Sequence, residues 1–297
     1  MGNWQKAVLN KVGNAAFGFG QKMFLKQDVT VAERRGEKLG DFAFRVLKSR
    51  RERAISNLAV AFPDWTDEQR YQTARKMFRH FGLVLADFMR TPLRTKEELL
   101  ENTEVEGFEH YESAAARGKG IIACTAHLGN WERFGHWLVA SGNSISVVAR
   151  DANQGGVQKQ VSKIRELTGV TVLSRGDSAR PILVKLKRKE IVGILCDQNS
   201  DESFVPFFGK PCGTVLGPAV LHQRTGAVLL PSYCVRIGPG RYKVICREPV
   251  DIENELKDPA ELMSRLNSVL ESVIREYPEQ WLWMHDRWKN ARKRNLL

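Results

Sequence analysis

The chain contains no apolar run long enough to cross a membrane. Of its 297 residues 42% are hydrophobic, but the longest uncharged stretch within the first fifty runs only from Val12 to Gln21. A spanning helix needs about 20 predominantly apolar residues. Apolar residues spread among lysines favour an interfacial amphipathic segment here, or a segment that docks on the core. No small-residue cleavage site follows an apolar region, so we expect no cleavable signal peptide.

Several signatures of catalytic and binding sites are also missing. The five cysteines are scattered and form no Cys-x2-Cys pair, which argues against a disulfide framework and favours reduced thiols in the cytosol. There is no Gly-x-Ser-x-Gly elbow for a serine nucleophile and no Gly-x4-Gly-Lys-Ser/Thr phosphate loop. We find no internal repeat and no low-complexity linker. We expect neither a cofactor nor a bound metal.

Basic residues outnumber acidic ones, 46 to 34, for a formal charge of +12. This balance suits an anionic partner such as a membrane surface, an acyl carrier protein or a phosphorylated glycolipid. Nucleic acid is not expected, because no regular interleaving of basic and aromatic residues accompanies the charge. The excess is concentrated in residues 45–53 and in the last eleven residues, which carry Arg287, Lys289, Arg292, Lys293 and Arg294.

One short stretch combines a buried strand, a loop and a helix. Residues 120–126 are free of charge and predict a strand, and Trp131 to Ala140 predicts a helix with Asn130 as its N-cap. His127 then lies on the loop and Glu132 in the first turn of the helix. A carboxylate can hold one imidazole nitrogen while the other takes a proton from a hydroxyl. This pair is suited to moving an acyl group onto an alcohol without an enzyme nucleophile.

Two other interpretations of the same residues stay open. Glu132 and His136 are four apart on the predicted helix and are able to pair with each other. Together with His127 they make two imidazoles and one carboxylate, a set that binds zinc in some hydrolases. A histidine and a glutamate five positions apart also occur by chance in many chains.

Polar residues follow two further predicted strands. Residues 191–196 are charge-free and end at Asp197 and Gln198, and residues 144–149 end at Arg150. Because ligands of open α/β sheets bind at the carboxyl ends of strands, we expect these residues beside His127. The guanidinium of Arg150 suits a phosphate, or forms an ion pair with a carboxylate. We interpret Asp197 as lining the site, although a helix cap or a structural acceptor is the commoner role of such a residue.

Strands that alternate with helical patterns predict an α/β fold, with a mixed sheet flanked by helices. We expect residues 1–100 to form an N-terminal helical region that associates with the membrane and residues 101–297 to form the α/β core, both within one compact unit. Within the core, residues 204–209 read as an uncharged aromatic loop. Its Phe207, Phe208 and Gly209 are either ordinary core or the wall of an acyl-chain groove.

Seven blocks of the chain resemble, in order, the bacterial lipid A biosynthesis late acyltransferases of the lysophospholipid acyltransferase superfamily. The stretch 126–132, Ala-His-Leu-Gly-Asn-Trp-Glu, is similar to the His-x4-Asp/Glu motif of that superfamily. The other blocks are 53–63, 148–150, 197–199, 204–209, 225–231 and 278–285. The family typically carries an N-terminal membrane helix, from which this chain departs.

The resemblance implies a glycerol-3-phosphate acyltransferase-like fold and acyl transfer without a cofactor. It implies an acyl carrier protein or acyl-CoA thioester as donor and a hydroxyl of a membrane glycolipid as acceptor, most often a lipid A precursor. It further implies the cytoplasmic face of the inner membrane, where we expect a peripheral location because the uncharged stretch near the N-terminus is too short to span. His127 is then the base and Glu132 orients it, while Gly129 and Asn130 amides stabilise the oxyanion.

Other functions remain open from the sequence. Relatives within the superfamily acylate phosphoinositide mannosides or other lysophospholipids. A metal-dependent hydrolase that uses His127, Glu132 and His136 belongs to another class, as does a non-catalytic protein that binds membranes or nucleic acid.

Overall fold

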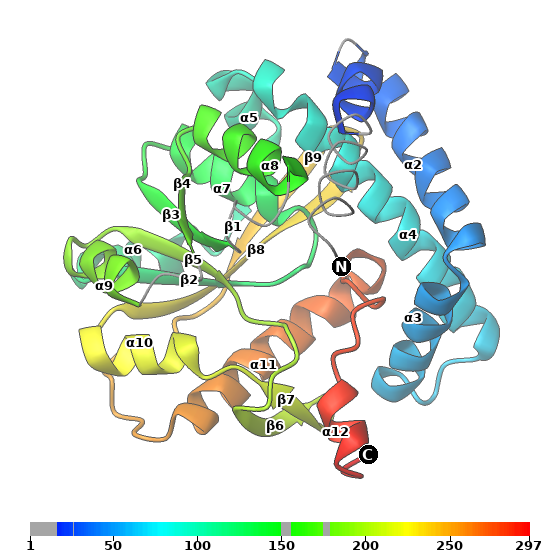
Figure 1. Cartoon of the computed structure of the whole chain (residues 1–297). Helices are drawn as coiled ribbons and strands as arrows, with labels where there is room; N and C mark the ends of the chain where they lie inside the picture. The colour runs from blue at the N-terminus through cyan, green and yellow to red at the C-terminus, as the bar shows by residue number, and fades with distance from the viewer. Residues whose placement is uncertain (1–16, 26, 150–155, 175–178) are drawn as a thin grey trace, which may run out of the picture.

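A seven-stranded sheet forms the centre of the molecule in a computed structural model that describes residues 17–25, 27–149, 156–174 and 179–297 (Figure 1). Its strand order is β1-β9-β8-β2-β5-β3-β4, and every neighbouring pair is parallel except the antiparallel pair β8–β9. The strands are β1 (Thr103–Glu106), β2 (Ile121–Thr125), β3 (Ile145–Ala149), β4 (Thr171–Ser174), β5 (Ile191–Leu195), β8 (Val228–Gly238) and β9 (Arg241–Cys246). The mixed sheet expected from the sequence is confirmed.

Strand β2 lies in the middle of this sheet because its sequence has no charge on either side. All five of its residues are buried, as is typical of a parallel strand that is covered on both faces. Ile121 and Ala123 pack into the core on one face, and Ile122 and Cys124 into the core on the other. Strand β8 is the longest of the sheet, because its second half pairs with β9 after its first half has paired with β2.

Helices cover both faces of the sheet (Figure 1). One face carries α5 (Lys96–Glu101), α6 (Phe108–Ala116), α7 (Trp131–Ala140) and α8 (Gly156–Leu167). The other carries α9 (Arg180–Lys187), α10 (Gly217–Thr225) and α11 (Pro259–Glu276). Helix α7 has the predicted bounds, and the Asn130 side chain caps it by accepting a hydrogen bond from the Arg133 amide.

The N-terminal helices confirm the expected helical region. They are α2 (Val29–Val46), α3 (Lys48–Ala61) and α4 (Asp67–Arg90), followed by the 3-10 turn η1 (Thr91–Leu93). Helices α2 and α4 touch backbone to backbone: a Cβ atom on Gly82 would lie 2.0 Å from the carbonyl oxygen of Gly36. Within the described residues, no helix combines the length and the hydrophobicity that crossing a membrane requires.

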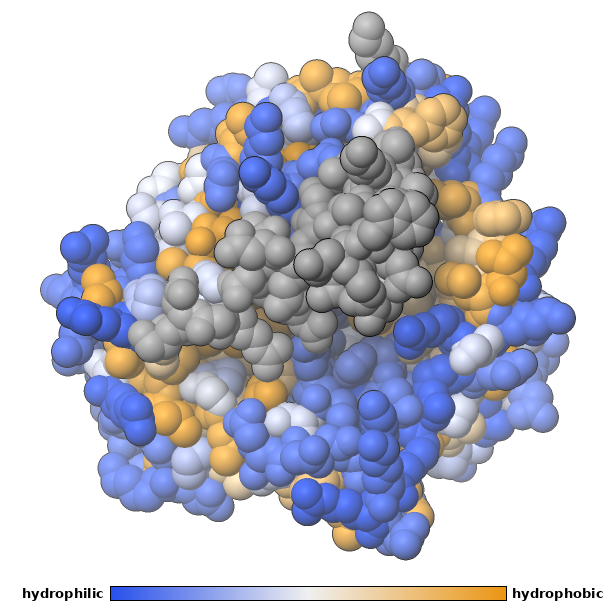
Figure 2. Space-filling model, viewed as in Figure 1, coloured by the Kyte–Doolittle hydropathy of each residue, from blue (hydrophilic) through white to orange (hydrophobic). Residues whose placement is uncertain are grey.

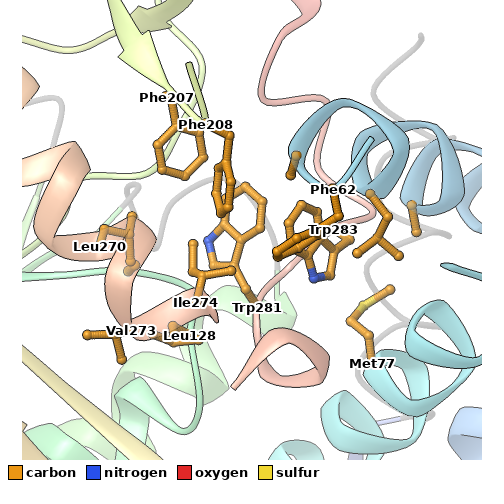
Figure 3. Close-up of a cluster of buried hydrophobic side chains, with 14 of the residues drawn as sticks. Phe62, Met77, Leu128, Phe207, Phe208, Leu270, Val273, Ile274, Trp281 and Trp283 are labelled. Atoms are coloured by element: carbon orange, nitrogen blue, oxygen red, sulfur yellow. The ribbon is translucent and has the colours of Figure 1, made fainter. Parts of the chain in front are cut away.

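The aromatic stretch 204–209 forms a hairpin instead of the expected loop. Strands β6 (Ser203–Phe207) and β7 (Lys210–Thr214) pair antiparallel, and Phe208 and Gly209 make the turn with φ values of 51° and 67°. Positive φ at both central residues is the geometry of a type I′ hairpin turn. Phe207 and Phe208 pack with Trp281 and Trp283 in a buried cluster (Figure 3).

This buried cluster also joins the helical region to the rest of the chain. Phe62 follows α3 and Met77 lies on α4, and both belong to the same cluster as Leu270 of α11 and Trp281 (Figure 3). Trp281 follows the 3-10 turn η3 (Pro278–Gln280), and the short helix α12 (Lys289–Lys293) comes near the chain end. The segment after α11 is thereby held against both the sheet and the N-terminal helices.

Candidate active site

The register between β2 and β5 brings His127 and Asp197 together. Thr125 pairs with Leu195 at the carboxyl ends of these parallel strands. His127 lies two residues after Thr125, and Asp197 lies two residues after Leu195. Their side chains meet, with Nδ1 of His127 2.9 Å from Oδ1 of Asp197. The backbone N–H of His127 also donates to Oδ2 of Asp197 at 2.9 Å. The predicted rim at the carboxyl ends therefore does bring these two residues side by side.

Asp197 is fixed by a third donor. The indole Nε1–H of the fully buried Trp281 donates to Oδ2 of Asp197 at 3.0 Å. The two oxygens of Asp197 therefore have separate tasks, since Oδ2 accepts two structural hydrogen bonds and Oδ1 faces the imidazole. An ionised carboxylate only accepts hydrogen bonds, so Nδ1 carries the proton and Nε2 is left as the basic nitrogen.

The electrostatics of the pair support this assignment. Burial lowers the pKa of His127, but the charge and the hydrogen bond of Asp197, helped by the charge of Glu132, hold that pKa above its ordinary value. Burial raises the pKa of Asp197, yet the charge and hydrogen bonds of His127 together with the Trp281 indole lower it to about 2. Asp197 is thus an ionised carboxylate that stabilises the protonated form of His127.

Glu132 does not make the contact with the imidazole that its spacing suggested. Its carboxylate accepts hydrogen bonds from Nε and Nη2 of Arg165 at 2.8 and 2.5 Å, and from the Trp131 indole at 3.0 Å. Burial raises the pKa of Glu132, and Arg165 lowers it below its ordinary value. The carboxylate on Nδ1 of His127 is that of Asp197, and Glu132 acts on His127 through charge alone.

The backbone amides of Gly129 and Asn130 are already occupied. The Gly129 N–H donates to the Gln280 carbonyl at 2.9 Å, and the Asn130 N–H donates to the Cys234 carbonyl at 2.6 Å. Gly129 has φ of +61°, and a Cβ there would lie 2.0 Å from the Cys234 oxygen. The expected oxyanion role of these two amides is therefore corrected: they anchor the loop that carries His127.

The rest of this loop is fixed from the same neighbouring segments. The Leu282 N–H donates to the His127 carbonyl at 3.1 Å, and Nε2 of buried His80 lies 3.0 Å from the Gly129 carbonyl oxygen. The Asn130 side chain donates to Asp87 at 2.8 Å. The loop after β2 thus holds His127 rigidly, as a pre-organised site requires.

His127 opens onto a cavity of about 470 Å³, which Glu132 and Gln198 also line. The hydrogen-bond ladder between β3 and β5 ends at Val147 and Gly193, although both strands continue. The cavity lies where the strands part, so its apolar wall comes from both faces of the sheet. One face contributes Phe134, Gly135, Ile145, Val147, Val170 and Gly193, and the other Val148, Ile182, Ile194, Pro218 and Leu221.

The remaining predicted site residues divide into three groups. Gln198 lines the cavity next to Asp197, as expected. Phe207 and Phe208 are buried among Trp281 and Trp283, and neither they nor Gly209 line the His127 cavity. They are core residues because the hairpin turns them inward. Arg150 lies outside the described residues.

The alternative zinc set is not assembled. Among the residues that the structure describes, no three His, Cys, Asp or Glu side chains are grouped to hold a metal ion. The Glu132 carboxylate is committed to Arg165, so it does not face a shared site with the two imidazoles.

Sequence comparisons show the family of the chain. The profile of the bacterial lipid A biosynthesis acyltransferase family matches residues 22–290. The chain belongs to this family. Among its relatives is a lipid A biosynthesis acyltransferase of Haemophilus influenzae, 28% identical over 83% of this chain and 78% of the relative. A lipid A biosynthesis lauroyltransferase of Escherichia coli is 26% identical over 87% of this chain and 85% of the relative.

A third relative differs in the substrate that its name gives. A phosphatidylinositol mannoside acyltransferase of Mycobacterium tuberculosis is 28% identical over 54% of this chain and 53% of the relative. This member of the family therefore has relatives that are named after different lipids.

Two residues of the site were not singled out from the sequence. Trp281 holds Asp197, and Arg165 holds Glu132. Trp281 lies in one of the seven family-like blocks. That block indicates that the segment is important, but it does not indicate that Trp281 contacts Asp197. Arg165 lies 33 positions from Glu132 with no local pattern between them, so its pairing had no sequence signal.

Proposed function

We propose that this protein transfers a fatty acyl group from a thioester donor to a hydroxyl of a membrane glycolipid. The observation that carries the proposal is the His127–Asp197 pair, whose imidazole lines a largely apolar cavity. An acyl chain of about a dozen carbons has a transfer free energy of roughly 10 kcal/mol from water. A cavity with apolar walls beside a general base suits such a chain.

The proposed reaction is direct transfer, with His127 as general base and then general acid. Nε2 takes the proton from the acceptor hydroxyl as its oxygen attacks the thioester carbonyl carbon. Asp197 stabilises the imidazolium that forms. When the tetrahedral intermediate collapses, the carbon–sulfur bond breaks, and the proton on Nε2 passes to the leaving thiolate. The products are an ester and a free thiol.

Gln198 is the proposed donor to the oxyanion. The Gly129 and Asn130 amides donate to other partners, whereas Gln198 follows Asp197 and lines the cavity. A side-chain amide is a suitable oxyanion donor. Glu132 and Arg165 border the same cavity, and their proposed role is to hold the first turn of α7 and to add negative potential near His127.

The proposed donor is an acyl carrier protein or acyl-CoA thioester, and the first proposed acceptor is a lipid A precursor. The relatives' names and the excess of basic residues support an anionic glycolipid. A phosphoinositide mannoside or another lysophospholipid is the second acceptor class, supported by the mycobacterial relative. The proposed role of Arg150 in binding phosphate belongs to the same proposal.

We place the protein peripherally at the cytoplasmic face of the inner membrane. Support comes from the outer side of α2 and the following residue, where Phe42, Val46 and Leu47 are 59%, 52% and 46% exposed. Hydrophobic side chains gather over α2 at the right-hand edge of Figure 2 among hydrophilic ones. Arg45 and Lys48 neighbour them in sequence and are exposed. Exposed apolar residues beside basic ones favour an anionic lipid surface.

Mass spectrometry of the products tests the proposed function. Purified protein is incubated with acyl carrier protein or CoA thioesters and with a lipid A precursor, a phosphoinositide mannoside or a lysophospholipid. We expect one acceptor to gain the mass of one acyl group, and folded His127→Ala to give no such product. Release of free fatty acid without acylated lipid, or no consumption of thioester, contradicts acyl transfer.

A further inference from the structure

A second cavity lies next to the His127 cavity under α6 and α7. It measures about 300 Å³ and is bounded by Tyr111 of α6, Trp137 and Leu138 of α7, and Ala123, Ile191 and Leu230 of the sheet. The two volumes, about 470 and 300 Å³, fall within the range of about 300–1,000 Å³ that is usual for ligand pockets. We call it the α6–α7 cavity.

The α6–α7 cavity is suited to apolar occupants only. Its polar side chains bind one another or the backbone: the Tyr111 hydroxyl donates to Asn143 at 2.5 Å, Ser141 to the Trp137 carbonyl at 2.9 Å and Ser232 to the Leu230 carbonyl at 3.3 Å. No described side chain in this cavity has a buried polar atom without a partner. A lining of this kind suits an apolar ligand.

Phe134 separates the two cavities. Of the described residues, it alone lines both. The walls are otherwise adjacent: Thr125 lines the first cavity, and Ala123, two residues earlier on the same face of β2, lines the second. Ile145 of the first cavity is the cross-strand partner of Ile191 in the second, and neighbouring strands are only about 4.8 Å apart.

Two glycines lie in the wall of the His127 cavity together with Phe134. Gly135 of α7 and Gly193 of β5 both line the His127 cavity and have no side chain there. A Cβ on Gly135 would lie 3.6 Å from Val170, and one on Gly193 would lie 3.5 Å from Ile145 and Val147. Glycine within a strand is typical of a place where a ligand approaches the backbone closely. We call the part of the His127 cavity that Gly135, Gly193 and Phe134 line the slot.

We propose that Phe134 limits the length of the transferred acyl chain, by closing the slot from the α6–α7 cavity. This inference rests on the proposed acyl transfer. The methyl end of the chain stops at the ring, and longer chains are excluded although apolar space lies behind it. Removal of the ring joins the two cavities and makes that space available to the chain.

The test is the chain-length profile of kcat/KM for Phe134→Ala and Phe134→Leu, with a series of saturated thioesters. We expect the preferred length to increase by several carbons in both variants, more in Phe134→Ala. Each methylene that becomes buried contributes about 0.8 kcal/mol, which is about fourfold in kcat/KM. Phe134→Leu keeps a branched apolar side chain and so guards against loss of folding.

Two matched variants identify the cause. Leu138→Ala enlarges the α6–α7 cavity without opening it to the slot, and we expect the wild-type length preference. Ala123→Leu fills the cavity from the sheet, so Phe134→Ala/Ala123→Leu should return toward the wild-type preference. A gain in Leu138→Ala equal to that in Phe134→Ala would contradict a barrier at Phe134.

Gly193→Ala tests the slot independently of Phe134. The added methyl makes ordinary contacts with Ile145 and Val147, so the variant folds, and we expect its preference to move toward shorter chains. Wild-type chain-length profiles in Gly193→Ala and in the folded Phe134 variants overturn the inference. If the wild-type protein transfers no acyl group from any thioester, the proposed function fails instead.

Discussion

Replacing Asp197 with asparagine should remove the function of His127 while leaving its ring in place. Oδ2 of Asp197 accepts hydrogen bonds from the His127 backbone and from the Trp281 indole. An asparagine therefore directs its carbonyl oxygen toward these two donors and its amino group toward Nδ1. Nδ1 must then accept a hydrogen bond, which moves the imidazole proton to Nε2, the nitrogen that serves as base.

The expected loss is large. A wrong histidine tautomer of this kind lowers kcat by about 10⁴-fold in a serine protease, and general-base catalysis contributes about 10²–10⁴-fold in typical enzymes. We therefore expect Asp197→Asn to lower kcat by about 10³–10⁴-fold. The measurement is steady-state acyl transfer, with thermal unfolding as a check on the fold. Asp41→Asn is the matched control, because that carboxylate pairs with Arg75 and Arg79 of α4.

The pH profile provides a second readout of the same variant. The base works only when it is neutral, so wild-type kcat/KM should rise with pH through a His127 pKa that lies above the ordinary value. In Asp197→Asn the raising charge is gone and burial remains, so the acid limb should move to lower pH. Wild-type kcat, or an acid limb that stays in place or moves to higher pH, would refute the assignment of Asp197.

Three further predictions concern the surroundings of the pair. Glu132→Gln should lower activity and move the acid limb less than Asp197→Asn does. Arg165→Gln should lower activity by a similar factor, since both variants break the same buried ion pair. If Arg165→Gln kept wild-type activity while Glu132→Gln lost it, Glu132 would act on the reaction directly. Gly129→Ala should lower the free energy of unfolding in urea by about 1–3 kcal/mol more than Gly142→Ala does. Both glycines have positive φ, but only a Cβ on Gly129 would collide with the backbone of Cys234. Equal losses of stability would contradict this close approach. Phe42→Ser should weaken flotation with anionic vesicles without changing the melting temperature; unchanged flotation would rule out this face of α2 as the membrane contact.

The features that were predicted best from the sequence depend on residues that are close together in the sequence. Helix α7 has the predicted bounds, because its N-cap at Asn130 and its apolar period are local signals. The rim at the carboxyl ends of the strands was also predictable, because charge-free runs ended at His127 and Asp197. The position of Asp197 beside the imidazole needed one more fact, which is the register of β2 against β5.

The errors share one physical cause, which is that the true partners are distant in the sequence. Glu132 lies on the helix next to His127, yet Arg165 reaches it from α8 and holds it there. The amides of Gly129 and Asn130 looked available, but Gln280 and Cys234 accept their hydrogen bonds from across the fold. No local pattern announces such contacts.

The aromatic hairpin shows the same limit for packing. An uncharged segment with three phenylalanines fits either a lipid groove or a core, and only the position of Trp281 and Trp283 decides between them. The hairpin turn at 208–209 directs Phe207 and Phe208 toward these indoles, and both are buried. Composition alone carries no information about that direction.

The most direct test of the account is the single-turnover rate of acyl transfer in wild type and in His127→Ala. The donor and acceptor are the pair that yields product with the wild-type protein, and thermal unfolding verifies that the variant is folded. The account predicts a rate at least about 10²-fold lower in the variant, with unchanged binding of the thioester. Transfer by folded His127→Ala at close to the wild-type rate would contradict it.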